Sequence, residues 1–242
     1  FNVAPLSIAH RFNSEVMRAG CSWVFTSATL TVGHEFGHFS QQLGIGQAKQ
    51  LILDSPFAYA EQSLLCVPRG LPDTGFARRA TELAQLLTPV INKVPGGVFF
   101  LCTSYQSMRQ IAEVLRRDVG RLVLLQGEDN KQRLLSQFVD NGRAILVATA
   151  SFWEGVDVRG AALSCVIIDK LPFTAPDEPL LKARMEDCRL QGGDPFTQLQ
   201  LPDAVITLKQ GVGRLIRDFQ DRGVLVLCDP RLVNRPYGAT FL

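Results

Sequence analysis

Six short apolar runs constrain the fold more than any other feature of this sequence. They show little of the polar alternation found in a sheet with one wet face, so we expect strands buried on both sides. The runs cover residues 64–67, 98–102, 123–125, 144–148, 165–168 and 224–228. Strands of this kind are typical of parallel sheets whose two faces are covered by helices.

Segments with helical periodicity separate several of these runs. Residues 81–93 and 107–117 each carry apolar side chains at the spacing of one helix face. Strands alternating with helices predict an α/β fold, with a doubly wound parallel sheet and helices on both faces. The proline-rich stretch 172–179 predicts a loop. A change of domain is placed near residues 51–56.

Composition limits the function classes. The 242 residues carry a net charge of only +2, so any nucleic-acid site must be a local patch. No two of the six cysteines form a C-x-x-C pair, and we expect reduced, mostly buried thiols rather than disulfides or a zinc cage. No apolar run approaches the length of a membrane span. The chain opens at Phe1 without a methionine, and we expect it to be a fragment.

The clearest chemistry lies in DAVITLKQGVGRLIRDF, residues 203–219, which we expect to be one helix. Its apolar residues share one face, while Gln210, Arg214 and Arg217 fall on the opposite face. Guanidinium groups match phosphate oxygens, so this row favours a polyphosphate ligand. An ordinary solvated basic face remains an equal alternative.

A second segment, ATASFWEGVDV, follows the buried run 144–148. Ligands gather at the carboxyl ends of strands in open α/β sheets. The polar and small residues of this loop are therefore binding candidates, against the alternative of an ordinary packed loop. They are Thr149, Ser151, Glu154, Gly155 and Asp157.

Two more segments end an apolar run in hydroxyl residues. VFFLCTSY ends in Thr103, Ser104 and Tyr105 before a predicted helix, whose N-terminus could bind phosphate. A simple N-cap at Thr103 or Ser104 is the favoured explanation. FTSATL follows the strand-like residues 23–25 and contains Ser27 and Thr29. Alone, this last signal is weak.

In chain order, FTSATL, VFFLCTSY, ATASFWEGVDV and QGVGRLIRD resemble motifs III, IV, V and VI of superfamily 2 helicases. The spelling SATL, SFWEGVDV and QGVGRLIR is most similar to the DinG/XPD branch, and closest to its YoaA-type members. IIDKLPF and CDPRL fit the same branch. The resemblance spans residues 27–232, and the ordered set is far more specific than any one motif.

The resemblance implies a second RecA-like motor domain over residues 53–242, carrying motifs IV, V and VI. Residues 1–52 would be a remnant of the first motor domain, carrying motif III. The full enzymes resemble ATP-dependent DNA helicases that move 5′ to 3′ on single strands in bacterial repair and replication, in the cytoplasm at the nucleoid. Implied partners are single-stranded DNA, the first motor domain and, as a candidate, the clamp-loader chi subunit.

The same resemblance implies residue roles. Arg214 and Arg217 match the arginine fingers of motif VI, and Gln210 and Gly213 belong to that motif. Residues that match motif V and would sense the nucleotide are Glu154, Gly155 and Asp157. Residues that would contact the DNA backbone are Thr103, Ser104, Tyr105, Thr149 and Ser151. Residues that match motif III and would couple hydrolysis to movement are Ser27 and Thr29.

Several parts of such an enzyme are missing from the sequence. No Gly-Lys dipeptide occurs, so there is no P-loop, and there is no D-E-A-H box. We therefore expect the ligands of Mg²⁺, most of the ATP site and the iron–sulfur cluster of the family to lie upstream. This chain has no cluster of four cysteines and no metal site is expected in it. The isolated chain is predicted to hydrolyse ATP negligibly.

Three alternatives remain. His34, Glu35 and His38 spell H-E-x-x-H, the zinc pattern of metalloproteases, but the only other histidine is His10 and no third ligand is evident. We expect both motif histidines on a short surface helix that ends near Leu43. The chain could also be a non-enzymatic module that docks DNA or a partner, or an ATPase that uses an arginine in trans, which the order of the motifs disfavours.

Overall fold

The computed structural model describes residues 4–75, 78–149, 152, 158, 160–175 and 177–241. The chain divides into two compact units. One combines the residues up to 54 with 173–209, and the other combines 55–172 with 210–242. The second unit contains the sheet. The assignment of residues 1–52 to a preceding motor domain concerns a longer protein and stays a prediction.

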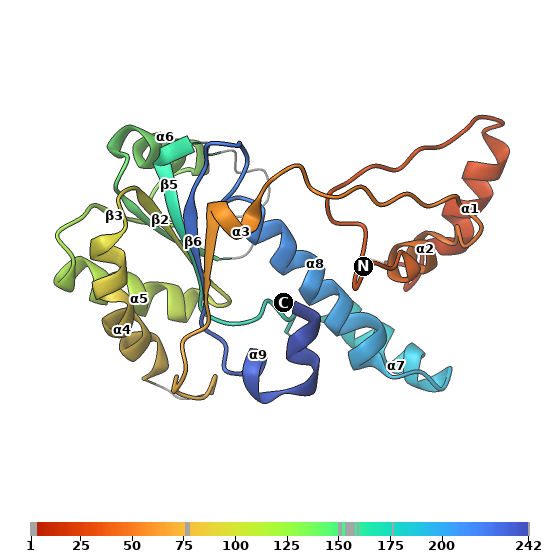
Figure 1. The fold of residues 1–242 in the computed structure, drawn as a ribbon. Helices are drawn as coiled ribbons and strands as arrows, with labels where there is room; N and C mark the ends of the chain where they lie inside the picture. Colours follow the sequence, from red (N-terminus) through yellow and green to blue (C-terminus); the bar gives the residue numbers. More distant parts are fainter. Residues whose placement is uncertain are drawn as a thin grey trace. The chain divides into compact units, whose positions relative to one another are not determined.

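All the pairings in the sheet of the second unit are parallel. The six strands lie in the order β1-β6-β5-β2-β4-β3 (Figure 1). Their bounds are β1 Ser63–Cys66, β2 Gly97–Cys102, β3 Val123–Leu125, β4 Ile145–Thr149, β5 Leu163–Ile168 and β6 Gly223–Leu227. Every residue of β2, β4 and β5 is buried, which is why these strands read as unbroken apolar runs. The predicted α/β RecA-like fold is confirmed.

Helices cover both faces of this sheet. α4 (Arg79–Lys93) and α5 (Tyr105–Asp118) pack together and share a core with alternate strand residues such as Phe100. The neighbouring residue in β2, Phe99, points the other way and contacts Phe138 of α6 (Lys131–Asn141), with ring centroids 4.7 Å apart. The period of two along β2 thus divides its side chains between two cores.

Shorter helices complete this unit. They are α3 Tyr59–Gln62, α9 Arg231–Asn234, and the 3₁₀ segments η2 Gly160–Ala162 and η4 Pro236–Phe241. The C-terminal η4 packs on α9, because Gly238 lies so close to the Leu232 backbone that a Cβ there would overlap it. None of the helices in the described ranges is long and apolar enough to cross a membrane.

The first unit is helical in its described part. It holds α1 Ala9–Arg18, α2 Gly37–Leu43, α7 Pro179–Leu190, the π-helical segment η3 Phe196–Gln200, and most of α8 Leu201–Val212. The strand expected at residues 23–25 is wrong, because no partner strand pairs with this described segment. Its aromatic side chains instead pack on Phe12 and on each other.

The helix expected over residues 203–219 is also partly wrong. α8 ends at Val212 and the chain continues through turns, with Arg214 N–H donating to Gly211 O at 3.3 Å. Two glycines in three residues weaken the helix here. Beyond them, Asp221 accepts the N–H groups of Arg217 and Asp218, both at 2.9 Å, which fixes a non-helical path. Gln210, Arg214 and Arg217 therefore do not share one helical face.

Candidate nucleic-acid and nucleotide sites

The carboxyl end of β2 leads directly into a helix N-terminus. Ser104 caps α5: its hydroxyl oxygen accepts the N–H of Ser107 at 3.1 Å and also bonds the Ser107 hydroxyl at 3.0 Å. The ordinary explanation for Ser104 is thus confirmed. Tyr105, the first residue of α5, stays 57 % exposed. The first turn of a helix carries free N–H groups and partial positive charge, so this end of the sheet is suited to an anion.

A buried carboxylate, Asp169, supports this turn from the next strand. Asp169 directly follows β5, is 2 % exposed, and accepts the N–H of Thr103 at 3.0 Å. Burial raises the pKa of Asp169 to about 6, against the opposing attraction of Lys170. Asp169 therefore fixes the backbone of the predicted DNA-binding turn and is itself poorly solvated.

Arg79 at the start of α4 ties the same edge of the sheet together. Its buried guanidinium donates to three backbone oxygens, those of Pro72 at 3.1 Å, Asp169 at 2.8 Å and Cys228. Asp169 and Cys228 follow adjacent strands, β5 and β6, so one side chain links two strand ends. Carbonyl groups that have no strand partner beyond the sheet thereby find a charged donor.

A small polar cavity of about 190 Å³ lies beside these groups. The polar residues that line it are Thr74, Arg79, Ser104, Gln106, Ser107, Gln110, Asp169 and Lys170. Two cations, one carboxylate, three hydroxyls and two amides favour a strongly polar occupant. Of the predicted site residues that the structure describes, Ser104 alone lines this cavity.

Thr149 ends β4 and is buried. Its N–H and its hydroxyl both donate to the side-chain oxygen of Gln126, at 2.7 and 3.0 Å. Thr149 thus lies at the same edge of the sheet as Thr103, with its hydroxyl engaged inside the protein. The remaining residues predicted for this loop lie outside the described residues: Ser151, Glu154, Gly155 and Asp157.

The predicted arginine fingers lie in the turns between α8 and β6. Arg214 and Arg217 are both half-buried. Desolvation lowers the pKa of Arg217 from its usual value, with Asp221 opposing the shift. Asp221 is itself buried and holds the backbone of this turn, while Gln62 donates to the carbonyls of Asp218 and Asp221 at 2.9 and 3.0 Å. The turn is therefore fixed although it is not helical.

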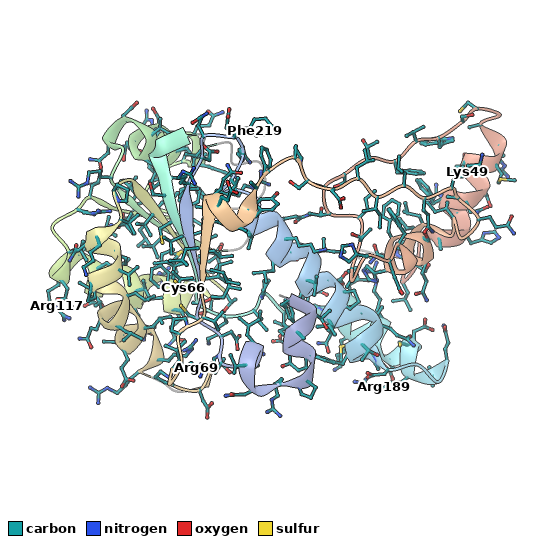
Figure 2. The ribbon with its side chains drawn as sticks, in the orientation of Figure 1. Lys49, Cys66, Arg69, Arg117, Arg189 and Phe219 are labelled. Carbon is teal, nitrogen blue, oxygen red and sulfur yellow. The ribbon has the colours of Figure 1, made fainter. Side chains whose placement is uncertain are left out.

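The structure separates the predicted site residues into two groups. Because all strands run the same way, the turn before β6 lies at the amino ends of the strands, whereas Thr103 and Thr149 follow the carboxyl ends. Figure 2 labels Phe219 in that turn and Cys66 at the carboxyl end of β1, and the two are well separated. Phe219 packs on Phe57, beside α3. The phosphate-type and DNA-type candidates are thus not one cluster.

The motif III candidates lie in a loop of the first unit. Ser27 Oγ accepts the N–H of Thr29 at 3.2 Å. Gln210, a motif VI candidate at the end of α8, is exposed. The expectation that both H-E-x-x-H histidines share a helix is wrong: His34 has a left-handed φ of 65°, outside α2, and only His38 is helical. Two imidazoles on one helical face are thus absent from this described segment, which disfavours the zinc protease. α2 does end at Leu43, with Gly44 left-handed.

Comparison with known proteins agrees with this fold. A family model described as the helicase C-terminal domain matches residues 87–242. The chain belongs to the helicase C-terminal domain family. It is 62 % identical over 240 residues to the ATP-dependent DNA helicase YoaA of Escherichia coli, covering 99 % of this chain. It is 36 % identical over 244 residues to the ATP-dependent helicase DinG of Mycobacterium tuberculosis.

The chain spans 38 % and 36 % of the length of these two curated relatives. Among solved structures, one described as an XPD helicase matches with a TM-score of 0.73 at 20 % identity, over 97 % of this chain and 43 % of that one. At that identity the match shows the fold alone. Together these findings confirm the prediction that this chain belongs to the DinG/XPD branch.

Sequence reasoning missed three residues that build the carboxyl edge. Asp169 and Lys170 stand in the quoted IIDKLPF, directly after a buried run, so their position alone could have marked them. Arg79 gave no such signal, because its burial depends on carbonyl groups that lie 90 and 149 residues away in sequence.

Proposed function

We propose that this chain is the C-terminal motor domain of an ATP-dependent DNA helicase that moves 5′ to 3′ in bacterial DNA repair and replication. The observation that carries the proposal is the 62 % identity, over 99 % of this chain, to a protein named an ATP-dependent DNA helicase. The six-stranded parallel sheet, with polar residues at its carboxyl edge, is compatible with a motor domain. Its location would be the cytoplasm, at the nucleoid.

In this proposal Arg214 and Arg217 stabilise negative charge that develops on the γ-phosphate of ATP held by the first motor domain. The half-buried setting of both arginines supports the role, because an ion pair gains strength where water is excluded. The bonds from Asp221 to the turn also support it, since a finger must be held in place. Gln210 and Gly213 belong to the same nucleotide-facing motif.

The loop between β4 and β5 would report the state of the nucleotide to the DNA. Its proposed residues are Glu154, Gly155 and Asp157, with Ser27 and Thr29 performing the related coupling from the other motif. Their placement in sequence supports this, because the loop joins two central strands of the sheet. Single-stranded DNA would then be held through Thr103, Ser104 and Tyr105, where the N-terminus of α5 offers backbone N–H groups to a phosphate. Thr149 and Ser151 complete this proposed set.

The family's iron–sulfur cluster and Mg²⁺ do not fit the residues of this chain. Cys102, Cys165 and Cys228 are buried, and burial raises the pKa of all three thiols, against the thiolate form that binds iron. Within the described ranges no three potential ligands lie together. We therefore assign both groups, and the P-loop that would bind ATP, to other parts of a longer protein.

Two partners belong to the proposal. The first motor domain of the same protein would complete the ATP site, because Arg214 needs a bound nucleotide to act on. The clamp-loader chi subunit is the candidate partner protein, and no particular surface is assigned to it.

The deciding experiment uses a full-length parent protein with its upstream domains. We expect DNA-stimulated ATP hydrolysis that Arg214→Ala lowers about a thousandfold, in line with other arginine fingers. Arg222→Ala is the matched control, since Arg222 is an exposed arginine in the same loop whose guanidinium bonds only the Glu61 carbonyl. Equal losses in both variants, or a parent without DNA-stimulated hydrolysis, would contradict the proposal. A tailed duplex with a 5′ or a 3′ single strand tests the direction.

A docking module for DNA or a partner is a second candidate for the 242 residues by themselves. The absence of a Gly-Lys dipeptide from the sequence favours it, because no P-loop is present to hold ATP. Negligible ATP hydrolysis together with salt-sensitive binding of single-stranded DNA would support it. Measurable turnover that Arg214→Ala removes would exclude it.

A further inference from the structure

Two polar contacts join α8 to the segment that follows Ser27–Leu30. Near its start, Asp203 Oδ1 lies 2.9 Å from His38 Nε2, and near its end Lys209 Nζ donates to the carbonyl of Thr31 at 2.9 Å. All four residues belong to one compact unit. The two contacts join residues that are 165 and 178 positions apart in sequence, so neither contact follows from local helix geometry.

The contact at His38 is the better shielded of the two. The His38 side chain is 9 % exposed, and the Gln42 amide lies 2.9 Å from the same ring nitrogen. An ionised carboxylate only accepts hydrogen bonds, so the tautomer that bonds Asp203 carries its proton on Nε2, and Gln42 then packs beside that nitrogen without donating to it. Asp203 lies in the first turn of α8, where a negative charge also interacts favourably with the helix dipole.

The second contact lies six residues further along α8, about 9 Å along the helix axis. Lys209 is a charged donor and Thr31 O is a backbone acceptor, a pairing stronger than one between neutral groups. Two attachments at different heights restrain both sliding and rotation of a helix, whereas one would restrain neither fully.

The position of α8 in the chain gives these contacts a consequence. The helix ends at Val212, and Arg214 lies two residues further on, in a turn. The N–H of Arg214 still donates to the carbonyl of Gly211. At the other end of the bridge, Thr31 is two residues after Thr29. α8 is therefore bonded at one side to the segment that follows the SATL loop, and its C-terminal end leads directly to the proposed arginine finger.

We propose that His38 and Lys209 are positioning residues, which hold α8 on the segment after the SATL loop and so set where Arg214 is presented to the nucleotide. This inference rests on the proposed function. His38, the second histidine of the H-E-x-x-H pattern, thus acts as the hydrogen-bond donor to Asp203 rather than as a zinc ligand.

The test measures ATP hydrolysis by the full-length parent at saturating single-stranded DNA. We expect His38→Ala and Lys209→Met each to lower kcat about tenfold, because small misplacement of a catalytic group is costly. The KM for ATP and the Kd for DNA should stay within about twofold, since neither residue is assigned to ligand binding in this proposal. A purely structural role would instead lower thermal stability and kcat and weaken the binding of ATP and DNA at the same time.

Rescue and coupling sharpen the result. His38→Gln keeps a side-chain N–H donor and Lys209→Arg keeps the cation, so both should retain most of the wild-type kcat. His38→Ala combined with Asp203→Ala should be no worse than either single variant, because both remove the same contact. Losses that multiply in the double variant would overturn the inference.

The matched control is His34→Asn, which changes the other histidine of the pattern. His34 is exposed with a left-handed φ of 65°, a conformation that asparagine tolerates, so kcat should not change. If His38→Ala does not fold, exposed Lys209 decides alone, since Lys209→Met keeps the aliphatic stem. An active parent with unchanged kcat in both variants overturns this inference only, whereas an inactive wild-type parent overturns the proposed function.

Discussion

Each of the two compact units of this chain is stabilised internally in a different way. The sheet unit buries whole strands and fixes their ends with buried charges, whereas α1 and α2 of the other unit bury no residue completely. Residues 1–54 also leave large apolar side chains in water, with Val24, Leu51 and Leu53 each at least 75 % exposed. The sheet unit has its own core, whereas residues 4–54 of the other unit are held by a few aromatic and polar contacts.

Substitutions should therefore affect stability differently in the two units. In the sheet unit, a buried Asp or Arg serves backbone groups at strand ends, so its loss leaves unsatisfied polar atoms inside the protein. In the helical unit, most contacts are near water, and their loss costs less. Variants of the 242-residue chain that remove one such group from either unit should show this contrast.

Arg79→Met should give the largest loss. It removes a buried guanidinium that bonds three backbone oxygens, and the carbonyls of Asp169 and Cys228 would be left buried without that donor. We expect the free energy of unfolding to fall by about 3 kcal/mol, measured by urea denaturation. Arg78→Met is the matched control, since Arg78 is the exposed preceding residue and should change stability by less than about 0.5 kcal/mol. Similar losses in the two variants would remove the contrast drawn here.

Asp221→Ala should cost about 2 kcal/mol. Its carboxylate accepts the N–H groups of Arg217 and Asp218 at 2.9 Å, and at 6 % exposure water cannot easily replace it. Asp218→Ala is the control, because the exposed side chain of Asp218 makes only a long bond of 3.4 Å to the N–H of Gln220. Circular dichroism during thermal unfolding checks the order of the two. An Asp218 variant that is the less stable one would contradict the assignment.

The limits of sequence reasoning follow the same contrast. All six sheet strands were predictable, because burial on both faces leaves a local record in apolar runs. The two glycines at the end of α8 were visible in the sequence, but the path of the turn beyond them was not, since it depends on Asp221 accepting the N–H of Arg217. The segment at residues 23–25 has strand-like composition but no strand to pair with, and pairing cannot be read from one segment. Motif positions were thus readable, while their relative placement depended on contacts distant in sequence.

Asp169 predicts a specific dependence of stability on pH. Burial raises its pKa from 3.8 to about 6, so between these values the folded chain binds more protons than the unfolded chain. The contribution of Asp169 to stability is therefore greatest at low pH and is lost as pH rises through about 6. From pH 5 to pH 7 this loss amounts to about 1 kcal/mol for a single group.

Asp169→Asn isolates that contribution from all other titrations. An asparagine side-chain oxygen can still accept the N–H of Thr103, but it cannot ionise. The change in unfolding free energy between pH 5 and pH 7 should therefore be about 1 kcal/mol less unfavourable in the variant than in the wild-type chain. Identical pH dependence in the two proteins would show that Asp169 titrates normally.

Phe25→Ala tests the helical unit and should have the smallest global effect. Phe25 contacts Phe12, Trp23 and Phe39, with ring centroids 6.0, 6.2 and 5.7 Å apart, and these rings link α1 to α2. Its loss should cost about 1 kcal/mol locally, so amide hydrogen exchange in α1 and α2 should rise about fivefold. Exchange in β2 should not change, because its core is separate. Met17→Ala, at a side chain 77 % exposed, provides the control. Faster exchange in β2 with Phe25→Ala would mean that the sheet also depends on these rings, and the two units would then unfold as one.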